Sequence, residues 1–107
     1  MPEIMQPIII DPQRVRDRLV RGRSIAYAIT EHMKSLGVDA RLFGSMKTGD
    51  IVIVSDIDIL VVDCSRLDHD EIAYQIHSLP SDIPVDVVFL DEIAAHARPR
   101  FLAAAGG

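Results

Sequence analysis

The sequence has one cysteine and no long run of apolar residues. Because Cys64 is the single cysteine among 107 residues, no intrachain disulfide can form, and a lone thiol suits a reducing compartment. Near the N-terminus the longest uninterrupted apolar run is Ile8 to Ile10, far short of a signal-peptide core or a membrane span. We therefore expect a cytoplasmic protein. Its length and a hydrophobic fraction of 49% predict a single globular domain over residues 1–107.

Positive charge is scarce in the second half of the chain. Residues 1–49 hold eight Lys and Arg against five acids, and residues 50–107 hold three against eleven. Five of the basic residues fall in one ten-residue window: Arg14, Arg16, Arg18, Arg21 and Arg23. On a helix they wrap around the axis rather than forming one stripe, which disfavours a dedicated nucleic-acid groove.

The local signals predict a small α/β domain. Asp11 and Pro12 are typical of a helix start and Gly37 of a helix end, with an apolar stripe between them at steps of three and four: Val15, Leu19, Gly22, Ala26, Ile29, Met33 and Leu36. Strands are predicted over residues 38–43, 57–62 and 85–90, and a short helix, introduced by Asp68 and Glu71 at capping-box spacing, through about residue 78. A last helical segment begins near Asp91 and is expected to be interrupted at Pro99.

Two carboxylates stand inside an apolar stretch. Residues two apart on a strand share a face, so Asp56 and Asp58 are predicted to lie side by side, where their charges repel. A hard divalent ion such as Mg²⁺ removes this repulsion by taking both as oxygen ligands. A third acid, Asp86, has a similar apolar setting and could act as a further ligand or as a general base.

Other motifs for these residues are absent. An EF-hand loop starting at Asp56 would need Gly and Glu where the chain has Val61 and Leu67, and a P-loop starting at Gly44 would need Lys where the chain has Asp50. The four histidines, His32, His69, His77 and His96, lack metal-ligand spacing, so we expect surface or half-buried side chains. Cys64 is expected to pack at a strand end.

A Gly-Ser pair, Gly44 and Ser45, precedes the Asp-x-Asp pair by ten residues. The segments FGSMKTG, SDIDILVV and PVDVVFLDEI together resemble the minimal nucleotidyltransferases of the DNA polymerase β superfamily, including those encoded beside HEPN-domain toxins as antitoxins. The resemblance covers roughly residues 42–92 and, by topology, the first helix. It implies an α/β (α+β) fold with a small mixed sheet and flanking helices.

The resemblance also implies roles for individual residues. Gly44 and Ser45 would hold the triphosphate of ATP, with Lys47 as a nearby cation, and Asp56 and Asp58 would bind one or two Mg²⁺ ions. Asp86 would bind the second ion or activate the acceptor hydroxyl. The chain departs from the family at Met46, Lys47 and Thr48, where arginine is frequent, and at the apolar residues 51–54, expected either to extend the second strand or to cover a partner protein.

Three functions follow as alternatives. The first is transfer of AMP from ATP to a hydroxyl on a partner protein, a HEPN-type toxin, by an antitoxin. The second is a binding module on the same fold that neutralises its partner by contact. The third is transfer to a small molecule such as an antibiotic, whose pocket would need a homo- or hetero-oligomer because 107 residues hold no second domain.

Overall fold

The computed structural model describes residues 11–106, so the apolar run at residues 8–10 lies outside the described part. The first helix, α1 (Pro12–Ser35), begins and ends where the sequence predicts. The side chain of Asp11 accepts a hydrogen bond from the backbone N–H of Gln13, and Gly37 has the left-handed φ of +80° that favours glycine after a helix. The middle of the predicted stripe is buried, whereas Leu36, the C-cap residue, is 37% exposed.

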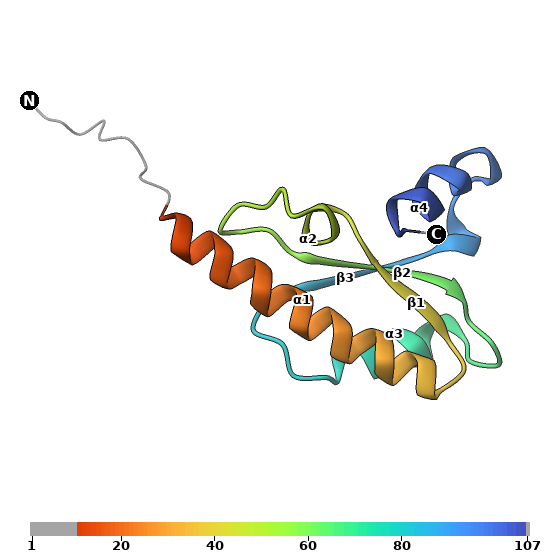
Figure 1. Cartoon of the computed structure of the whole chain (residues 1–107). Coiled ribbons are helices and arrows are strands. Elements are labelled where there is room, and N and C mark those ends of the chain that lie inside the picture. Colours follow the sequence, from red (N-terminus) through yellow and green to blue (C-terminus); the bar gives the residue numbers. More distant parts are fainter. Residues whose placement is uncertain (1–10, 107) are drawn as a thin grey trace, which may run out of the picture.

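A mixed three-stranded sheet lies beside α1, as predicted (Figure 1). Its strands are β1 (Asp39–Phe43), β2 (Ile57–Asp63) and β3 (Val85–Phe89), in the order β1-β2-β3. β1 pairs with β2 in antiparallel and β3 pairs with β2 in parallel orientation. A parallel pair needs a crossover connection, which α3 (His69–His77) provides.

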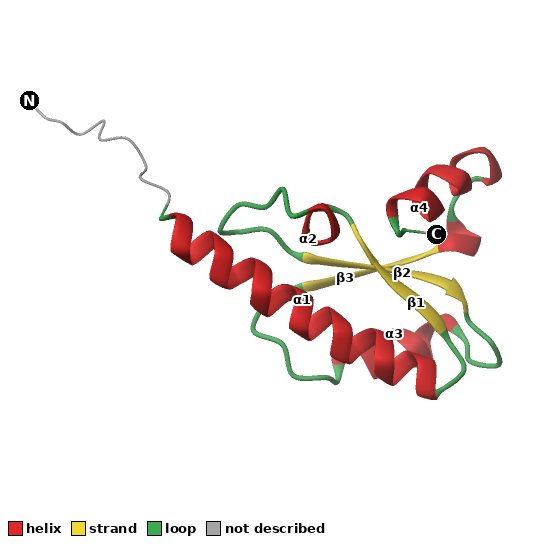
Figure 2. Cartoon of the chain, viewed as in Figure 1, coloured by secondary structure: helices red, strands yellow, loops and turns green. Residues whose placement is uncertain are grey.

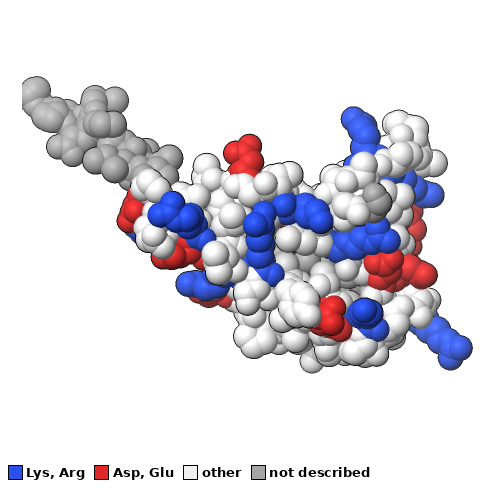
Figure 3. Space-filling model, viewed as in Figure 1, with Lys and Arg blue, Asp and Glu red and all other residues white. Residues whose placement is uncertain are grey.

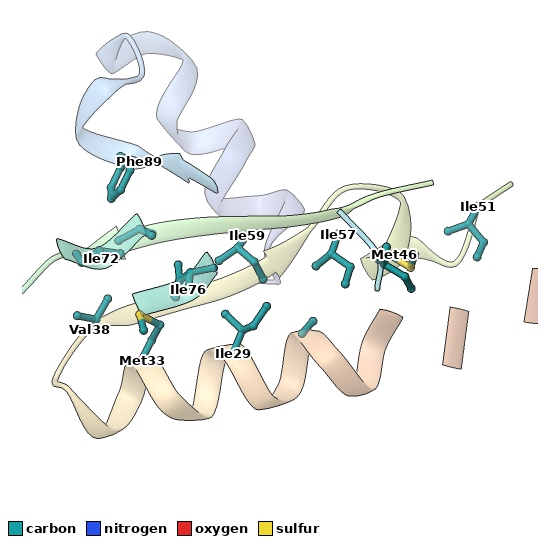
Figure 4. Packing of buried hydrophobic residues seen from close by; sticks show 14 residues of the cluster. Ile29, Met33, Val38, Met46, Ile51, Ile57, Ile59, Ile72, Ile76 and Phe89 are labelled. Atoms are coloured by element: carbon teal, nitrogen blue, oxygen red, sulfur yellow. The ribbon is translucent and has the colours of Figure 1, made fainter. Parts of the chain in front are cut away.

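The two faces of the sheet differ in what covers them. Ile57, Ile59 and Val61 pack with residues of α1 and α3 in the main core, and Figure 4 shows Ile59 on the side of the sheet that faces Ile29 of α1, with Ile76 of α3 beside it. Strand residues between them point to the opposite face. There α4 (Arg98–Ala104) covers part of the sheet, with the ring of Phe101 tilted against that of Phe43 at a centroid distance of 5.8 Å.

The segment between β1 and β2 differs from the prediction. Ser45–Thr48 form one short helix, α2, where only a turn was expected. The apolar residues 51–54 do not extend β2, so that prediction is wrong; they form a loop, drawn green in Figure 2. β1 ends at Phe43 and leaves no strand for them to pair with. Instead Ser55 closes a turn, because its N–H bonds to the Val52 carbonyl and its hydroxyl accepts from the Val52 N–H.

The second half of the chain confirms the predicted helix after β2 and corrects the last one. The Asp68 side chain caps α3 by accepting from the N–H of Glu71 at 2.8 Å, but Glu71 itself bonds to Gln75, so the capping box is only half formed. Two short 3-10 helices, η2 (Leu90–Glu92) and η3 (Ala95–Ala97), follow β3. Pro99 then lies in the first turn of α4 rather than interrupting a helix, because its missing N–H costs nothing there.

The basic residues of α1 are largely engaged within the chain. Arg18 donates to the carbonyl of Ser55, Arg21 pairs with Asp82, and Arg23 donates to the carbonyls of α2. Figure 3 shows Lys and Arg scattered over the face of the molecule seen in Figure 1, with acidic side chains between them. These contacts favour a structural role for these three arginines. Within residues 11–106 no helix has the length and apolar character needed to cross a membrane.

Candidate active site

Asp58 and Asp86 are direct neighbours on β2 and β3. They are register partners across the parallel pair, which places their Cα atoms one strand spacing apart, about 4.8 Å. Both alternate with residues of the main core and therefore point to the opposite face of the sheet, away from α1 and α3. Asp58 is half-buried and Asp86 is exposed. Two acids predicted from separate parts of the sequence are thus brought together.

Asp56 lies one residue before β2 begins, close enough to influence Asp58. Partial burial raises the pKa of the Asp58 carboxyl, and the negative charges of Asp86 and then Asp56 raise it further. Because Asp86 and Asp56 both influence the Asp58 carboxyl, the three acids share one electrostatic environment. The arrangement is strained by like charge and supplies only oxygen donors, which is the donor set that a hard divalent cation prefers.

The turn after β1 closes tightly around Asp58. A Cβ placed on Gly44 would overlap Oδ2 of Asp58 and lie 3.2 Å from its Cγ. Gly44 also has φ +73° and ψ −156°, a conformation open essentially to glycine alone. Ser45 follows as the first residue of α2. The predicted Gly-Ser pair therefore lies beside the predicted acids, and the structure adds a reason for the glycine: the approach of the Asp58 carboxylate.

Contacts with α1 hold α2 in place. Met46 is fully buried, and a Cβ on Gly22 would lie 2.5 Å from its Sδ, so helix and side chain are in close contact. Arg23 donates to the carbonyl of Met46 at 2.8 Å and to that of Lys47 at 3.1 Å. Sequence reasoning placed Gly22 in the core stripe and Arg23 in a basic cluster, and missed that both support the Gly-Ser turn. Neither spacing nor composition carries a signal for such long-range contacts.

Lys47 and Arg100 line two different cavities. Lys47 lies next to Gly106 and lines a cavity of about 470 Å³ between α1 and β1, together with Arg23, Tyr27 and Arg41. A cavity of about 350 Å³ adjoins the carboxylate site instead, and its lining includes Gly44 itself. The other lining residues come from the end of β1 and from α4: Phe43, Arg100, Phe101 and Ala104. Arg100, for which the sequence carries no signal, therefore lines the same cavity as Gly44.

The histidines and Cys64 lie in the predicted environments, and His69 has a further feature. His32 is half-buried, with Nε2 3.0 Å from the Gln75 amide oxygen, and His77 lies 3.0 Å from the Val85 carbonyl. Cys64 packs at the end of β2, where burial, and then nearby carboxylates, raise the pKa of its thiol and disfavour a nucleophilic thiolate. His69 differs, because it lies close to both Cys64 and Asp91 at the far end of the sheet.

Comparisons with known proteins agree with this geometry. The sequence model of the nucleotidyltransferase domain matches residues 28–104, which include α2, all three strands and the three acids. A search of curated proteins found no match.

Two solved structures resemble the chain. One is a protein from Sulfolobus solfataricus described as a nucleotidyltransferase, with 19% identity and a TM-score of 0.53 over 92% of this chain and 86% of that one. The other is Cid1, with RNA terminal uridylyl transferase activity, at 18% identity and a TM-score of 0.48; the match covers 86% of this chain and 36% of Cid1. The first supports the mixed-sheet fold, and the match to the domain model over most of the described residues shows that the chain belongs to the nucleotidyltransferase domain family.

Proposed function

We propose that the protein is a Mg²⁺-dependent nucleotidyltransferase that transfers AMP from ATP to a hydroxyl group on a partner protein. The observation that carries this proposal is the pairing of Asp58 with Asp86 on the face of the sheet opposite α1 and α3, with Asp56 nearby and Gly44 against Asp58. Three carboxylates that repel one another, placed next to a glycine turn, fit a site for metal-bound phosphates.

Asp56 and Asp58 would hold the metal. Their oxygens suit Mg²⁺, and a cation would offset both the burial and the repulsion by Asp86 and Asp56 that raise the pKa of Asp58. When bound, one or two such ions would offset the negative charge of the phosphates and of the developing transition state. Asp86 either completes the ligand set for a second ion or serves as the base, for which its exposure on the open face is suitable.

The remaining residues would position the nucleotide. Gly44 lets the backbone approach the phosphates and the Ser45 hydroxyl donates to a phosphate oxygen. Lys47 would supply a cation only if its side chain turned away from the cavity between α1 and β1. Arg100 already lines the cavity beside Gly44, and its planar fork suits a phosphate better than an ammonium does.

The chemistry is a single displacement at the α-phosphorus of ATP. The acceptor oxygen forms a bond to that phosphorus as the bond to pyrophosphate breaks, and the hydroxyl proton passes to Asp86 in its role as base. The chain's contribution is chiefly to align the two reactants. We propose a HEPN-type toxin as the acceptor protein, which this chain would neutralise as its antitoxin.

The loop before Asp56 supports a protein acceptor. Val52, Ile53 and Val54 are 50%, 37% and 74% exposed, an apolar group directly preceding the carboxylates in the chain. Such a group suits a protein surface better than a small hydroxyl compound. The same exposure also favours the second candidate function, a module that neutralises its partner by contact alone.

Labelled ATP tests these functions together. The purified chain is incubated with Mg²⁺ and ATP labelled either at the α- or at the γ-phosphate, with and without the protein encoded by the neighbouring gene. We expect label on that protein from α-labelled ATP only, and its loss in Asp58→Asn but not in Asp70→Asn, which removes an exposed acid on α3. A tight complex without label would support the binding module. Turnover of an added small hydroxyl compound, with no labelled protein, would support the third function.

A further inference from the structure

A second group of metal-ligating side chains lies at the other end of the sheet. One ligand atom each from Cys64, His69 and Asp91 can be chosen so that all three lie within 4.8 Å of one another. Cys64 directly follows β2, Asp91 lies in η2 directly after β3, and His69 begins α3. Because β2 and β3 are parallel, their carboxyl ends meet at one edge, and the connecting helix starts there too.

This cluster is separate from the candidate active site. Asp58 is the second residue of β2 and Cys64 follows its last, a distance along the strand of six residues or about 20 Å. The donor chemistry differs as well, since the active site offers oxygen alone and this cluster offers sulfur, nitrogen and oxygen. Thiolate and imidazole favour zinc and similar transition metals over Mg²⁺.

The imidazole of His69 is held in a defined orientation. Its Nε2 lies 3.0 Å from Oδ2 of Asp91 and its Nδ1 lies 3.2 Å from Oε2 of Glu92. The ring stacks on Phe89 with centroids 3.9 Å apart and an interplanar angle of 11°. A carboxylate that accepts the Nδ1–H bond leaves Nε2 free to bind a metal, an arrangement common around zinc-bound histidines.

We propose that Cys64, His69 and Asp91 form a zinc site, with Glu92 accepting the Nδ1–H bond and water as the fourth ligand. Ligand atoms around a tetrahedral zinc ion are about 3.5 Å apart, given bond lengths of about 2.0–2.3 Å. The imidazole and carboxylate atoms, 3.0 Å apart, are already close enough, and any separation near the 4.8 Å limit has to shorten by about 1 Å. The Asp91 side chain is 61% exposed and can make this adjustment by rotating. The metal displaces the thiol proton on binding.

The bound ion would connect three segments of the chain. It would join the end of β2 to the turn after β3 and to the start of α3, and would stabilise the fold according to its free concentration. The competing interpretation is an ion pair of His69 with the two acids, which needs no metal and no cysteine. The two interpretations therefore differ in whether Cys64 takes part.

Cobalt substitution provides the direct test, because the chain has one cysteine and any thiolate-to-cobalt charge-transfer band must come from it. The tag-free protein is titrated with Co²⁺ and the absorption spectrum recorded, followed by displacement with Zn²⁺. We expect one equivalent of Co²⁺, a charge-transfer band, and its loss when Zn²⁺ is added. Absence of the band from the folded wild-type protein would overturn the proposal without any variant.

Variants assign the ligands. Zinc affinity, measured by competition with a chromophoric chelator, is expected to fall by more than about 100-fold in Cys64→Ser and His69→Gln and by about 10-fold in Glu92→Gln. Two controls should bind zinc like the wild type: His77→Gln, at the other end of α3, and Asp58→Asn, in the candidate active site. Equal zinc affinity in the wild type and Cys64→Ser would leave only the ion pair. Asp58→Asn is expected to lose nucleotidyl transfer but to bind zinc like the wild type. Failure of this proposal can therefore be distinguished from failure of the proposed function.

Discussion

Gly44 and Asp58 are in such close contact that a side chain on residue 44 would overlap the Asp58 carboxylate. The backbone of Gly44, at φ +73° and ψ −156°, excludes other residues independently of that contact. Two requirements for glycine, one conformational and one steric, therefore meet at the exit of β1. As a result, the position of the Gly-Ser turn at the end of β1 and the position of the Asp58 carboxylate on the paired strand β2 depend on each other.

The variant Gly44→Ala is expected to lose activity and stability together. Its backbone strain costs about 1–3 kcal/mol of unfolding free energy. The new methyl group displaces Asp58, and a misplacement of this kind lowers transfer by about 100-fold. Urea denaturation and nucleotidyl transfer by the fraction that remains folded measure the two effects. The matched control is Gly37→Ala, since Gly37 also has a left-handed φ, of +80°, but lies after α1; it should lose stability and keep activity. Wild-type transfer by Gly44→Ala would contradict the relationship.

Removing the charge of Asp58 is expected to stabilise the metal-free protein at neutral pH. Burial and the charges of Asp86 and Asp56 raise the pKa of Asp58 in the folded state above its unfolded value of about 3.9. The folded state therefore binds this proton more tightly, and as pH rises from the unfolded pKa through the folded pKa, the unfolding free energy falls.

Asp58→Asn should not show this pH-dependent loss. In EDTA at pH 7 its unfolding free energy should exceed that of the wild type by about 1 kcal/mol or less, since solvent screens the partly exposed carboxyl. Denaturation of both proteins between pH 4 and 8 provides the measurement. Added Mg²⁺ should stabilise the wild type more than Asp58→Asn. Equal stability of the two proteins across this range would show that the repulsion is negligible.

The features predicted from sequence are those that depend on neighbouring residues. The Asp11 cap and Gly37 set the ends of α1, and alternation in the first strand and apolar runs in the other two located the strands to within one or two residues. Spacing along a strand also indicated that Asp58 faces away from the core. The meeting of Asp58 and Asp86 depends on the parallel pairing of β2 and β3, and the family resemblance implied it only by giving Asp86 a role in the same site.

Features that depend on distant partners were missed or mispredicted. Residues 51–54 have strand-like composition, but β1 ends too early to pair with them, so they form a loop. Pro99 predicts a helix interruption from local sequence, but α4 begins beside it. Cys64, His69 and Asp91 lack any motif spacing, and only the parallel βαβ topology brings them together.

The contact between Gly22 and Met46 is expected to control the docking of α2. Alanine is normally favoured over glycine inside a helix by about 1 kcal/mol. Here the added Cβ would lie 2.5 Å from the Met46 sulfur, and because Met46 is fully buried its side chain has little room to move; Gly22→Ala should therefore destabilise by about 1–2 kcal/mol and shift the Gly-Ser turn. A double-mutant cycle with Met46→Ala checks the cause, because the smaller side chain should relieve part of the penalty. Ser24→Ala, at an exposed position of α1, is the control. A Gly22→Ala protein more stable than the wild type would exclude the contact.

The exposed Val54 is expected to contribute to partner binding and not to folding. Because it is 74% exposed, Val54→Ser should change the unfolding free energy by less than about 0.5 kcal/mol. If the apolar loop before Asp56 contacts the acceptor protein, the same change should weaken the complex by about tenfold, measured by calorimetry with the protein encoded by the neighbouring gene. Val20→Ser is the matched control, since Val20 is 69% exposed on α1 and lies on the helix rather than on the loop. Unchanged affinity in Val54→Ser, or an equal loss in both variants, would place the partner's contact elsewhere on the molecule.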